Sequence, residues 1–472
     1  MTIYPPTASL PRSGTALTGR WTDIFRADAL VHITLMASIV FGVFQGYLKD
    51  RMGGPLPYAL ADGMFLLAAL IWLGTIALRR DPIRGPGAVP AILLAVILVP
   101  TLYLLHPGTP FLIKLAGLRG WSLFPVAALM GLGVVRNSGQ LRAYVGLILA
   151  LCVATALYGI YQYQLGPEVV IQAGDLALQR HGATVFYSVV PGGPIEFRAF
   201  STFTFPAPFA AFMVFGILLA AGIATSKERS RKQRLFAALL IPLFFVGMTV
   251  SGTRAALIIL LAGLTVLAWY RGLSLRQMLL IPVGVIGFHA ATVLTAGSAM
   301  ERFRSVVLEE GLLWLYVRRP IVTAWESLWQ YPFGMGLGRT GIGVPFAITI
   351  RMPQGYFVFT DGDIGRAAVE LGIVGLALLA LIIIALLRYT PWSMRTLRGT
   401  SADDVALGFG AVILSTAIVV LIGSPFSTIP HGVIWWFFFG AVLNLAMWPE
   451  DHELEPAPTE PEQVPEPLGP TA

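Results

Sequence analysis

Charge and cysteine are both scarce in this 472-residue chain. Charged residues make up 12% of it and hydrophobic residues 56%, whereas a soluble domain has a charged fraction of about 25%. This scarcity excludes an ordinary soluble protein and indicates one that spans a membrane several times. Cys152 is the single cysteine, which excludes a disulfide within the chain. The first 28 residues lack a signal-peptide pattern, so we expect the first apolar run to be retained as a span.

Long apolar runs fill most of the sequence. They are roughly 17–23 residues long, the length that a helix needs to cross ~30 Å of hydrocarbon. The pattern predicts an all-α integral membrane protein with about 12 transmembrane helices. We place them near residues 30–48, 57–78, 88–105, 118–135, 141–163, 206–225, 235–250, 255–270, 278–295, 367–387, 405–422 and 433–448.

The distribution of Lys and Arg orients these spans. With a cytoplasmic N-terminus, the short inner loops and the N-terminal segment carry more than half of the 32 basic residues, as the positive-inside rule requires. This topology places both termini in the cytoplasm and two long segments, 164–205 and 296–366, at the outer face. We therefore predict a cytoplasmic segment over 1–28 and a polytopic membrane domain over 29–448.

The C-terminal end differs in composition from the rest of the chain. Residues 449–472 contain seven acidic residues, no Lys or Arg, and many prolines. A segment of this kind buries too little apolar surface to fold. We predict a disordered cytoplasmic tail, with a regulatory role as the alternative to a merely solvated terminus.

The predicted outer face carries arginines that the positive-inside rule does not explain. A guanidinium group is planar, always charged, and pairs bidentately with phosphate oxygens. Arginines beside the outer ends of apolar helices therefore suit a phosphate or pyrophosphate linked to a lipid. These arginines are Arg198, Arg254, Arg302, Arg304, Arg318, Arg319, Arg339, Arg351 and Arg366.

Four elements combine such arginines with small residues, prolines or glycines. The second of them is a tight turn that opens a helix, whose unpaired N–H groups suit an anion. The third begins within an aromatic helix that we expect over 312–330, ended by Tyr331-Pro332. The elements are 198–206, 251–256, 318–338 and 360–375, the last containing Glu370-Leu371-Gly372-Ile373-Val374-Gly375.

In this order the elements resemble those of the O-antigen ligase and O-antigen polymerase superfamily of bacterial inner-membrane glycosyltransferases, over roughly residues 195–390. The resemblance implies a GT-C-like enzyme that moves a glycan from an undecaprenyl-pyrophosphate carrier to an acceptor hydroxyl at the periplasmic face. It implies no cofactor and no metal. The implied partners are the lipid-linked oligosaccharide, membrane lipids, a chain-length regulator and a flippase, and no nucleic acid.

The same resemblance suggests roles for individual residues. Ligases of the family carry a His shortly before the Glu-x-Gly-Ile-x-Gly helix, whereas this chain has no His within 296–366. A carboxylate is then the natural base, and we favour a polymerase of O-antigen, exopolysaccharide or capsule over a ligase to the lipid A core of lipopolysaccharide. The implied pyrophosphate-binding residues are Arg198, Arg254, Arg318 and Arg319, the supporting residues Arg339, Arg366 and Glu370, and the catalytic candidates Asp361, Asp363 and Glu196.

Simpler interpretations stand beside these roles. Asp361 can cap the helix that follows it, and Glu370 can pair with Arg366 four positions earlier on a helix. Arg318 and Arg319 point ~100° apart on a helix, so the sequence does not choose between them. Three outward histidines, His106, His181 and His431, remain as further candidates.

A twelve-helix secondary transporter is the alternative from another functional class. Such transporters usually consist of two related six-helix halves joined by a long cytoplasmic link. Here the central link is only about residues 226–234, and the longest loops are both outward. This arrangement favours the enzyme.

Overall fold

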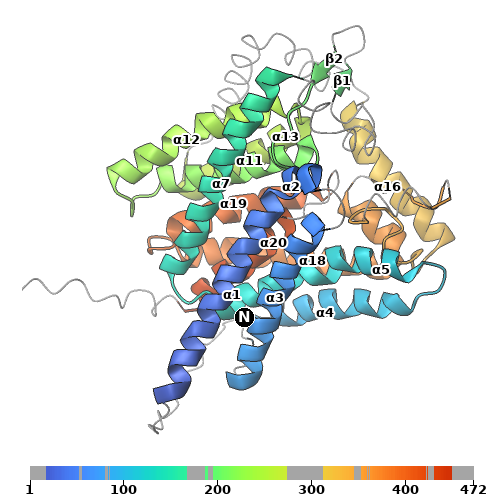
Figure 1. Ribbon diagram of the computed structural model, residues 1–472, viewed down its shortest axis with the longest axis horizontal. Helices are drawn as coiled ribbons and strands as arrows, with labels where there is room; N and C mark the ends of the chain where they lie inside the picture. The colour runs from blue at the N-terminus through green and yellow to red at the C-terminus, as the bar shows by residue number, and fades with distance from the viewer. Residues whose placement is uncertain are drawn as a thin grey trace, which may run out of the picture.

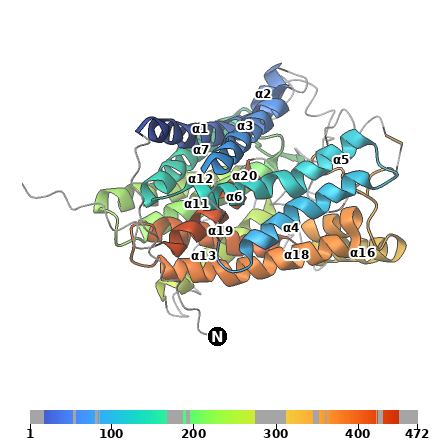
Figure 2. The same ribbon diagram turned by 90° about the horizontal axis from the view of Figure 1, so that it is seen from below.

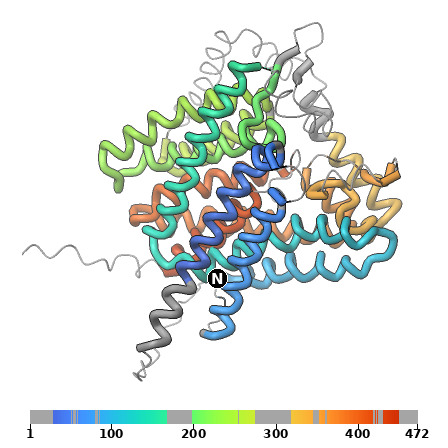
Figure 3. The backbone as a smooth tube through the Cα atoms, in the orientation of Figure 1, coloured from blue at the N-terminus to red at the C-terminus, as the bar shows by residue number. Residues whose placement is uncertain are grey.

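The computed structural model describes most of the predicted membrane domain (Figure 3). The residues described are 18–52, 56–79, 83, 85–166, 187–189, 195–273, 312–344, 352–353, 355–358, 360, 362–420, 423 and 430–448.

Helices dominate this part of the chain, and they pack side by side (Figures 1 and 2). A short antiparallel hairpin of β1 and β2 accompanies them, with Ser188 opposite Glu196. In chain order the elements are α1 (Thr18–Val43), α2 (Gln45–Met52), α3 (Leu56–Arg79), α4 (Val89–Leu102), the 3-10 turn η1 (Tyr103–Leu105), α5 (Phe111–Leu118), the π-helical turn η2 (Arg119–Leu123), α6 (Phe124–Val134), α7 (Ser138–Leu165), β1 (Tyr187–Val189), β2 (Ile195–Phe197), α11 (Pro206–Ala224), α12 (Arg231–Val250), α13 (Arg254–Arg271), α16 (Leu312–Gln330), α18 (Asp363–Thr396), α19 (Asp403–Val419) and α20 (His431–Met447).

The helices confirm the coarse prediction of an α-helical membrane protein. Within the described residues, six helical stretches are long and apolar enough to cross a membrane, and four shorter apolar helices accompany them. The six are Ala59–Leu78, Phe111–Val134, Ser138–Leu165, Pro206–Ala224, Arg231–Val250 and Asp363–Thr396.

Each predicted span within the described residues coincides with helix; the span predicted over 278–295 lies outside them. Two expected continuous helices are interrupted. The span predicted over 30–48 divides into α1 and α2 at Phe44, and α18 contains non-helical dihedral angles at Gly372. The aromatic helix predicted over 312–330 is confirmed as α16.

Local sequence explains several helix ends. Asn137 caps α7 by accepting a hydrogen bond from the Gln140 amide, and Ser230 and Gln233 form a reciprocal capping box at the start of α12. Gly272 ends α13 in the left-handed conformation that glycine adopts without strain.

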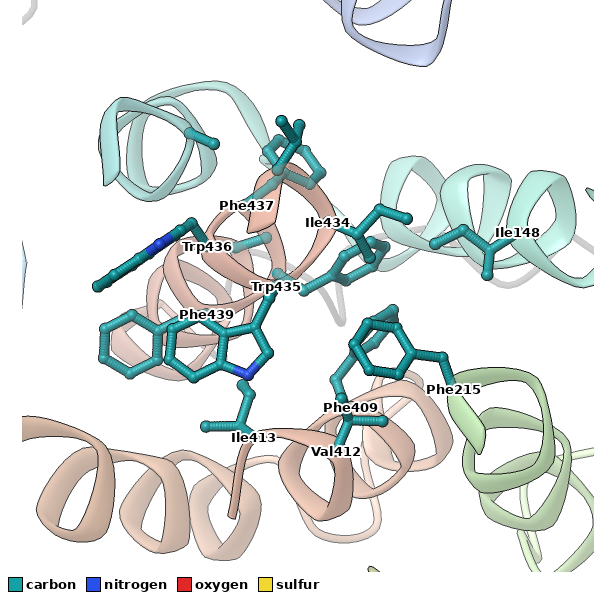
Figure 4. Packing of buried hydrophobic residues seen from close by; sticks show 14 of the residues in the cluster. Ile148, Phe215, Phe409, Val412, Ile413, Ile434, Trp435, Trp436, Phe437 and Phe439 are labelled. Carbon is teal, nitrogen blue, oxygen red and sulfur yellow. The ribbon is translucent and has the colours of Figure 1, made fainter. Parts of the chain in front are cut away.

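The core surrounds α20, which is apolar on all sides and therefore buried on all sides. Trp435 is fully buried, with Phe439 stacked beside it; Ile413 and Phe409 of α19 and Phe215 of α11 belong to the same core cluster (Figure 4). Gly131 of α6 and Gly440 of α20 let these two helices approach closely, because a Cβ on either glycine would collide with the other helix's backbone.

Ion pairs join the predicted cytoplasmic ends of several helices. Asp403 and Asp404 begin α19, and both are almost fully buried. Arg271, at the end of α13, lies 2.7 Å from Asp403, and Arg229, in the α11–α12 connection, lies 2.7 Å from Asp404. The start of α19 is thereby fixed to two other helix connections.

Candidate functional site

Arg198 joins the first predicted element to the second. Its Nε donates a hydrogen bond to the Ser251 carbonyl oxygen at 3.1 Å, and its Nη2 donates to Thr253 Oγ1 at 3.1 Å. The Ala199 amide also donates to the Val250 carbonyl oxygen at 3.0 Å. Arg198 therefore lies on the turn between α12 and α13, directly before Arg254, the first residue of α13. The Arg254 side chain lies outside the described residues.

The residues after Arg198 are fixed by side chains that the sequence did not single out. Gln162 of α7 accepts hydrogen bonds from the Phe200 and Ser201 amides at 3.0 and 2.8 Å. Ser201 has a positive φ of 54°, and its hydroxyl donates to the Thr155 carbonyl oxygen at 2.7 Å. Thr202 donates to the Val43 carbonyl oxygen at 2.8 Å, beside the break between α1 and α2. Buried glutamines of this kind carry no pattern in a sequence.

The third and fourth elements are joined through their backbones. The Met335 amide donates to the Val369 carbonyl oxygen at 2.7 Å, and the Ile373 amide donates to the Pro332 carbonyl oxygen at 2.9 Å. These bonds form because α18 is interrupted at Gly372, which frees backbone groups that a continuous helix would use internally. The turn over residues 332–338, the glycine turn, thus docks into the break in α18 at Gly372. We call this contact the joint.

Glycines are required on both sides of this joint. Gly334 has a φ of +83° and Gly372 a φ of +63°, values that side-chain-bearing residues rarely adopt. A Cβ on Gly334 would lie 2.5 Å from the Glu370 carbonyl oxygen, and a Cβ on Gly372 would overlap the Pro332 carbonyl oxygen. The spacing of glycines in the third and fourth elements therefore reflects close contact of two backbones.

A buried polar network lies behind the joint. Arg366 and Glu370 are 1% and 0% exposed. They form the ion pair that their spacing of four positions on a helix suggested, with Arg366 Nε 3.3 Å from Glu370 Oε2. Trp121 Nε1 donates to Glu370 Oε2 at 2.8 Å, and Arg366 also donates to the Gly117 carbonyl oxygen at 3.0 Å. Thr340 donates to the second carboxylate oxygen. Arg366 and Glu370 therefore support the joint from inside the protein.

The π-helical turn η2 brings Trp121 to this network. A π-helical turn inserts one extra residue into a helix and is often found at functional positions. Arg119, in the same turn, lies 2.9 Å from Asp62 of α3, and the Arg366 guanidinium lies over the Trp121 ring at 4.8 Å from its centroid. Nothing in the sequence pattern marks this turn.

The catalytic candidates differ in how far the structure describes them. Asp363 is the first residue of α18, 2% exposed, and lines a small cavity with Gly120, Trp121 and Trp436. Asp361 and the side chain of Glu196 lie outside the described residues. The Asp363 side chain is therefore almost closed to solvent, whereas Asp361 and Glu196 stay candidates from the sequence.

Arg318 and Arg319 are both exposed on α16. Arg318 shares a helical stripe with Val322, Trp325 and Trp329, whose exposed fractions are 37%, 61% and 74%. Arg319 points ~100° away from that stripe. The structure therefore distinguishes the surroundings of the two arginines: Arg318 is the one in line with the exposed tryptophans.

Arg339 follows the glycine turn and packs against a nearby ring. Its guanidinium lies 4.0 Å from the centroid of the Tyr356 ring, and its carbonyl oxygen accepts a hydrogen bond from the Val358 amide at 2.9 Å. Arg339 thus fixes residues 356–358 next to the third element.

Gly423 and the start of α20 contact the two joined pairs of elements. The Asp363 amide donates to the Gly423 carbonyl oxygen at 3.2 Å, and the His431 ring lies 5.9 Å from the Phe203 ring, centroid to centroid. Gly423 and His431 are eight positions apart in the sequence, a separation that spans at most about 28 Å. The fourth element therefore contacts Gly423, and the first element contacts His431 at the start of α20, eight positions further along the chain.

These geometries define the class of the protein as an α-helical membrane protein with buried charge between its helices. No protein-family model matches the chain, and comparison with the curated proteins finds no match. Within the described residues, no group of three or more His, Cys, Asp or Glu side chains is placed to hold a metal ion.

Proposed function

We propose that this protein is a glycan polymerase that joins undecaprenyl-pyrophosphate-linked oligosaccharide repeat units at the periplasmic face of the bacterial inner membrane. The product would be an O-antigen, exopolysaccharide or capsule. The observation that carries the proposal is the contact between Arg198 and the turn that precedes Arg254. It brings two arginines, 56 positions apart in the sequence, to the N-terminus of one helix.

The N-terminus of α13 suits a pyrophosphate for two reasons. Its first N–H groups have no partner within the helix, and the helix dipole favours negative charge there. Guanidinium groups add a full positive charge in bidentate geometry. The hydrogen bonds from Nε and Nη2 hold the plane of the Arg198 guanidinium before any substrate binds, so little reorganisation is needed.

The reaction requires charge stabilisation and one proton transfer. The acceptor hydroxyl forms a new C–O bond with the anomeric carbon of the donor, and the bond from that carbon to the pyrophosphate oxygen breaks. The pyrophosphate leaves with the electron pair, and Arg198, Arg254 and either Arg318 or Arg319 would stabilise its charge. A base removes the hydroxyl proton; Asp361, Asp363 and Glu196 are the candidates from the sequence.

The proposal includes a topology of about twelve spans in a GT-C-like arrangement, with both termini cytoplasmic. The positions of the basic residues support it, because the connections that hold Arg229 and Arg271 would then be cytoplasmic. The Arg198–Ser251 contact would face the periplasm, where lipid-linked repeat units are presented.

Glycan analysis of a host that lacks this chain tests the function. The deletion strain is complemented with wild type, Arg198→Ala, Arg319→Ala or Asp361→Asn. We expect the deletion to leave single repeat units without long chains, and Arg198→Ala to fail in restoring them. Long polymer that stays on its carrier lipid would indicate the ligase instead. Normal glycans in the deletion strain would refute a glycosyltransferase and favour the transporter.

A further inference from the structure

We infer that His106, in the connection between η1 and α5, is the base that takes the proton from the acceptor hydroxyl. This inference rests on the proposed function, and it assigns the role of base to His106 in place of the carboxylates Asp361, Asp363 and Glu196 that the sequence suggested. The starting point is the position of the side chain: a Cβ built on Gly336 of the glycine turn would lie 3.1 Å from His106 Nδ1. The imidazole therefore packs against the turn of the third element.

The connection that carries His106 is bound to both halves of the joint. Thr109 Oγ1 donates a hydrogen bond to the Met335 carbonyl oxygen at 3.3 Å, and the Tyr103 hydroxyl donates to the Leu371 carbonyl oxygen at 3.0 Å. Met335 belongs to the glycine turn and Leu371 to the break in α18. His106 lies between these two anchors in sequence, so its backbone is fixed where the third and fourth elements meet.

Two further contacts fix His106, one to its ring and one to its backbone. The Tyr103 ring lies parallel to it, with the centroids 6.1 Å apart and an angle of 7° between the planes. Buried Lys114 donates hydrogen bonds from Nζ to the carbonyl oxygens of Leu104 and His106, both at 2.7 Å. Lys114 is thus the charged group beside this histidine, and its ammonium holds the backbone while the ring is held by Tyr103.

The ring nitrogens have different surroundings. Nδ1 is buried against the glycine turn and has no hydrogen-bond partner among the described residues. The side chain as a whole is half-buried and Nδ1 is its buried nitrogen, so we place the ligand at the opposite edge of the ring, which carries Nε2. Histidine is the side chain that most often serves as a general base.

The other charged groups of the joint are less suited to this role. Glu370 is fully buried and already accepts from Trp121, Thr340 and Arg366. Asp363 is 2% exposed. In the reaction, the proton of the acceptor hydroxyl would pass to the accessible ring nitrogen as the hydroxyl oxygen bonds to the anomeric carbon. The imidazolium would then release this proton to water or to the departing pyrophosphate.

The test uses purified full-length protein in vesicles with an undecaprenyl-pyrophosphate-linked oligosaccharide. His106→Gln keeps the size of the side chain but cannot take a proton. We expect its rate at saturating substrate to fall by about 10²–10⁴-fold, the usual contribution of a general base, with KM nearly unchanged. His32→Gln is the matched control, because His32 is also half-buried but contacts Tyr144 on α7, away from the joint.

Rescue by a small molecule separates catalysis from structure. For His106→Ala, added imidazole is expected to restore part of the rate, which a purely structural role would not allow. Activity of His106→Gln close to wild type, or loss of activity in His106→Ala without rescue, overturns the inference. Either result with active wild type leaves the proposed function intact, whereas inactive wild type refutes the proposed function itself.

Discussion

The Arg198 guanidinium is tied to Thr253 by a hydrogen bond of 3.1 Å from Nη2 to Oγ1, across 55 positions of sequence. Thr253 is the N-cap residue of α13, but its own side chain does not cap the helix. Its hydroxyl is instead available to orient an arginine at the point where α13 begins.

Replacing Thr253 by Val tests this orientation. The substitution removes the acceptor of the Arg198 Nη2 bond and keeps the branched shape of the side chain. A hydrogen bond to a charged group contributes about 1.5–3 kcal/mol, so we expect polymer formation to slow by about tenfold or more. Thr265→Val is the control, because among the described residues the Thr265 hydroxyl bonds only to the Leu261 carbonyl oxygen within α13. Equal chain-length distributions for the two variants would contradict the role of Thr253.

The joint between the glycine turn and α18 predicts an intolerance of side chains at Gly372. An alanine there requires a left-handed backbone, which costs about 1–2 kcal/mol, and its Cβ overlaps the Pro332 carbonyl oxygen. We expect Gly372→Ala to lower the midpoint of thermal unfolding in detergent. Gly74→Ala, within α3 and with no atom near the added Cβ, should leave the midpoint unchanged or raise it slightly. An unfolding midpoint of Gly372→Ala equal to that of the wild type would contradict the close contact between Gly372 and Pro332.

The buried pair of Arg366 and Glu370 predicts a non-additive pair of mutations. Glu370→Met leaves a buried guanidinium without its carboxylate, which typically costs about 3–5 kcal/mol. Arg366→Met combined with Glu370→Met removes both charges and should be less destabilising than Glu370→Met alone. The free energies of unfolding of wild type, the two single variants and the double variant, measured by denaturation, form a double-mutant cycle. Additive losses would mean that the two side chains do not interact as described.

Labelling of single cysteines tests the topology. Cys152 is fully buried, so a Cys152→Ala background removes the only native thiol. Gln330→Cys, on the exposed face of α16, should react with a membrane-impermeant maleimide in spheroplasts with intact membranes. Lys232→Cys, exposed at the start of α12, should react only after the membrane is opened. The reverse pattern would invert the predicted orientation.

Much of the helical architecture could be predicted because its signal is local. Runs of apolar residues mark the helices, and the aromatic run before Tyr331-Pro332 predicted the bounds of α16. The possible pairing of Arg366 with Glu370 also follows from spacing along a single helix, and the structure confirms it.

The break in α18 could not be predicted in the same way. Gly372 lies within an apolar run that reads as a continuous helix, and a single glycine in such a run is usually tolerated. The break is stabilised by Pro332, 40 positions earlier, and no local pattern carries that contact. The position of Trp121 beside Glu370 and that of His106 beside Gly336 depend on tertiary packing in the same way.

Reconstituted glycan transfer tests whether Arg198 takes part in polymerisation. Purified wild type and Arg198→Ala are placed in vesicles with undecaprenyl-pyrophosphate-linked repeat units, and both lengthened glycan and released undecaprenyl pyrophosphate are quantified. If the protein is a glycan polymerase, wild type forms both products in equal amounts. Arg198→Ala forms neither product, although it unfolds at the same temperature as wild type. Wild type that forms neither product, or Arg198→Ala that forms both at the wild-type rate, would contradict this prediction.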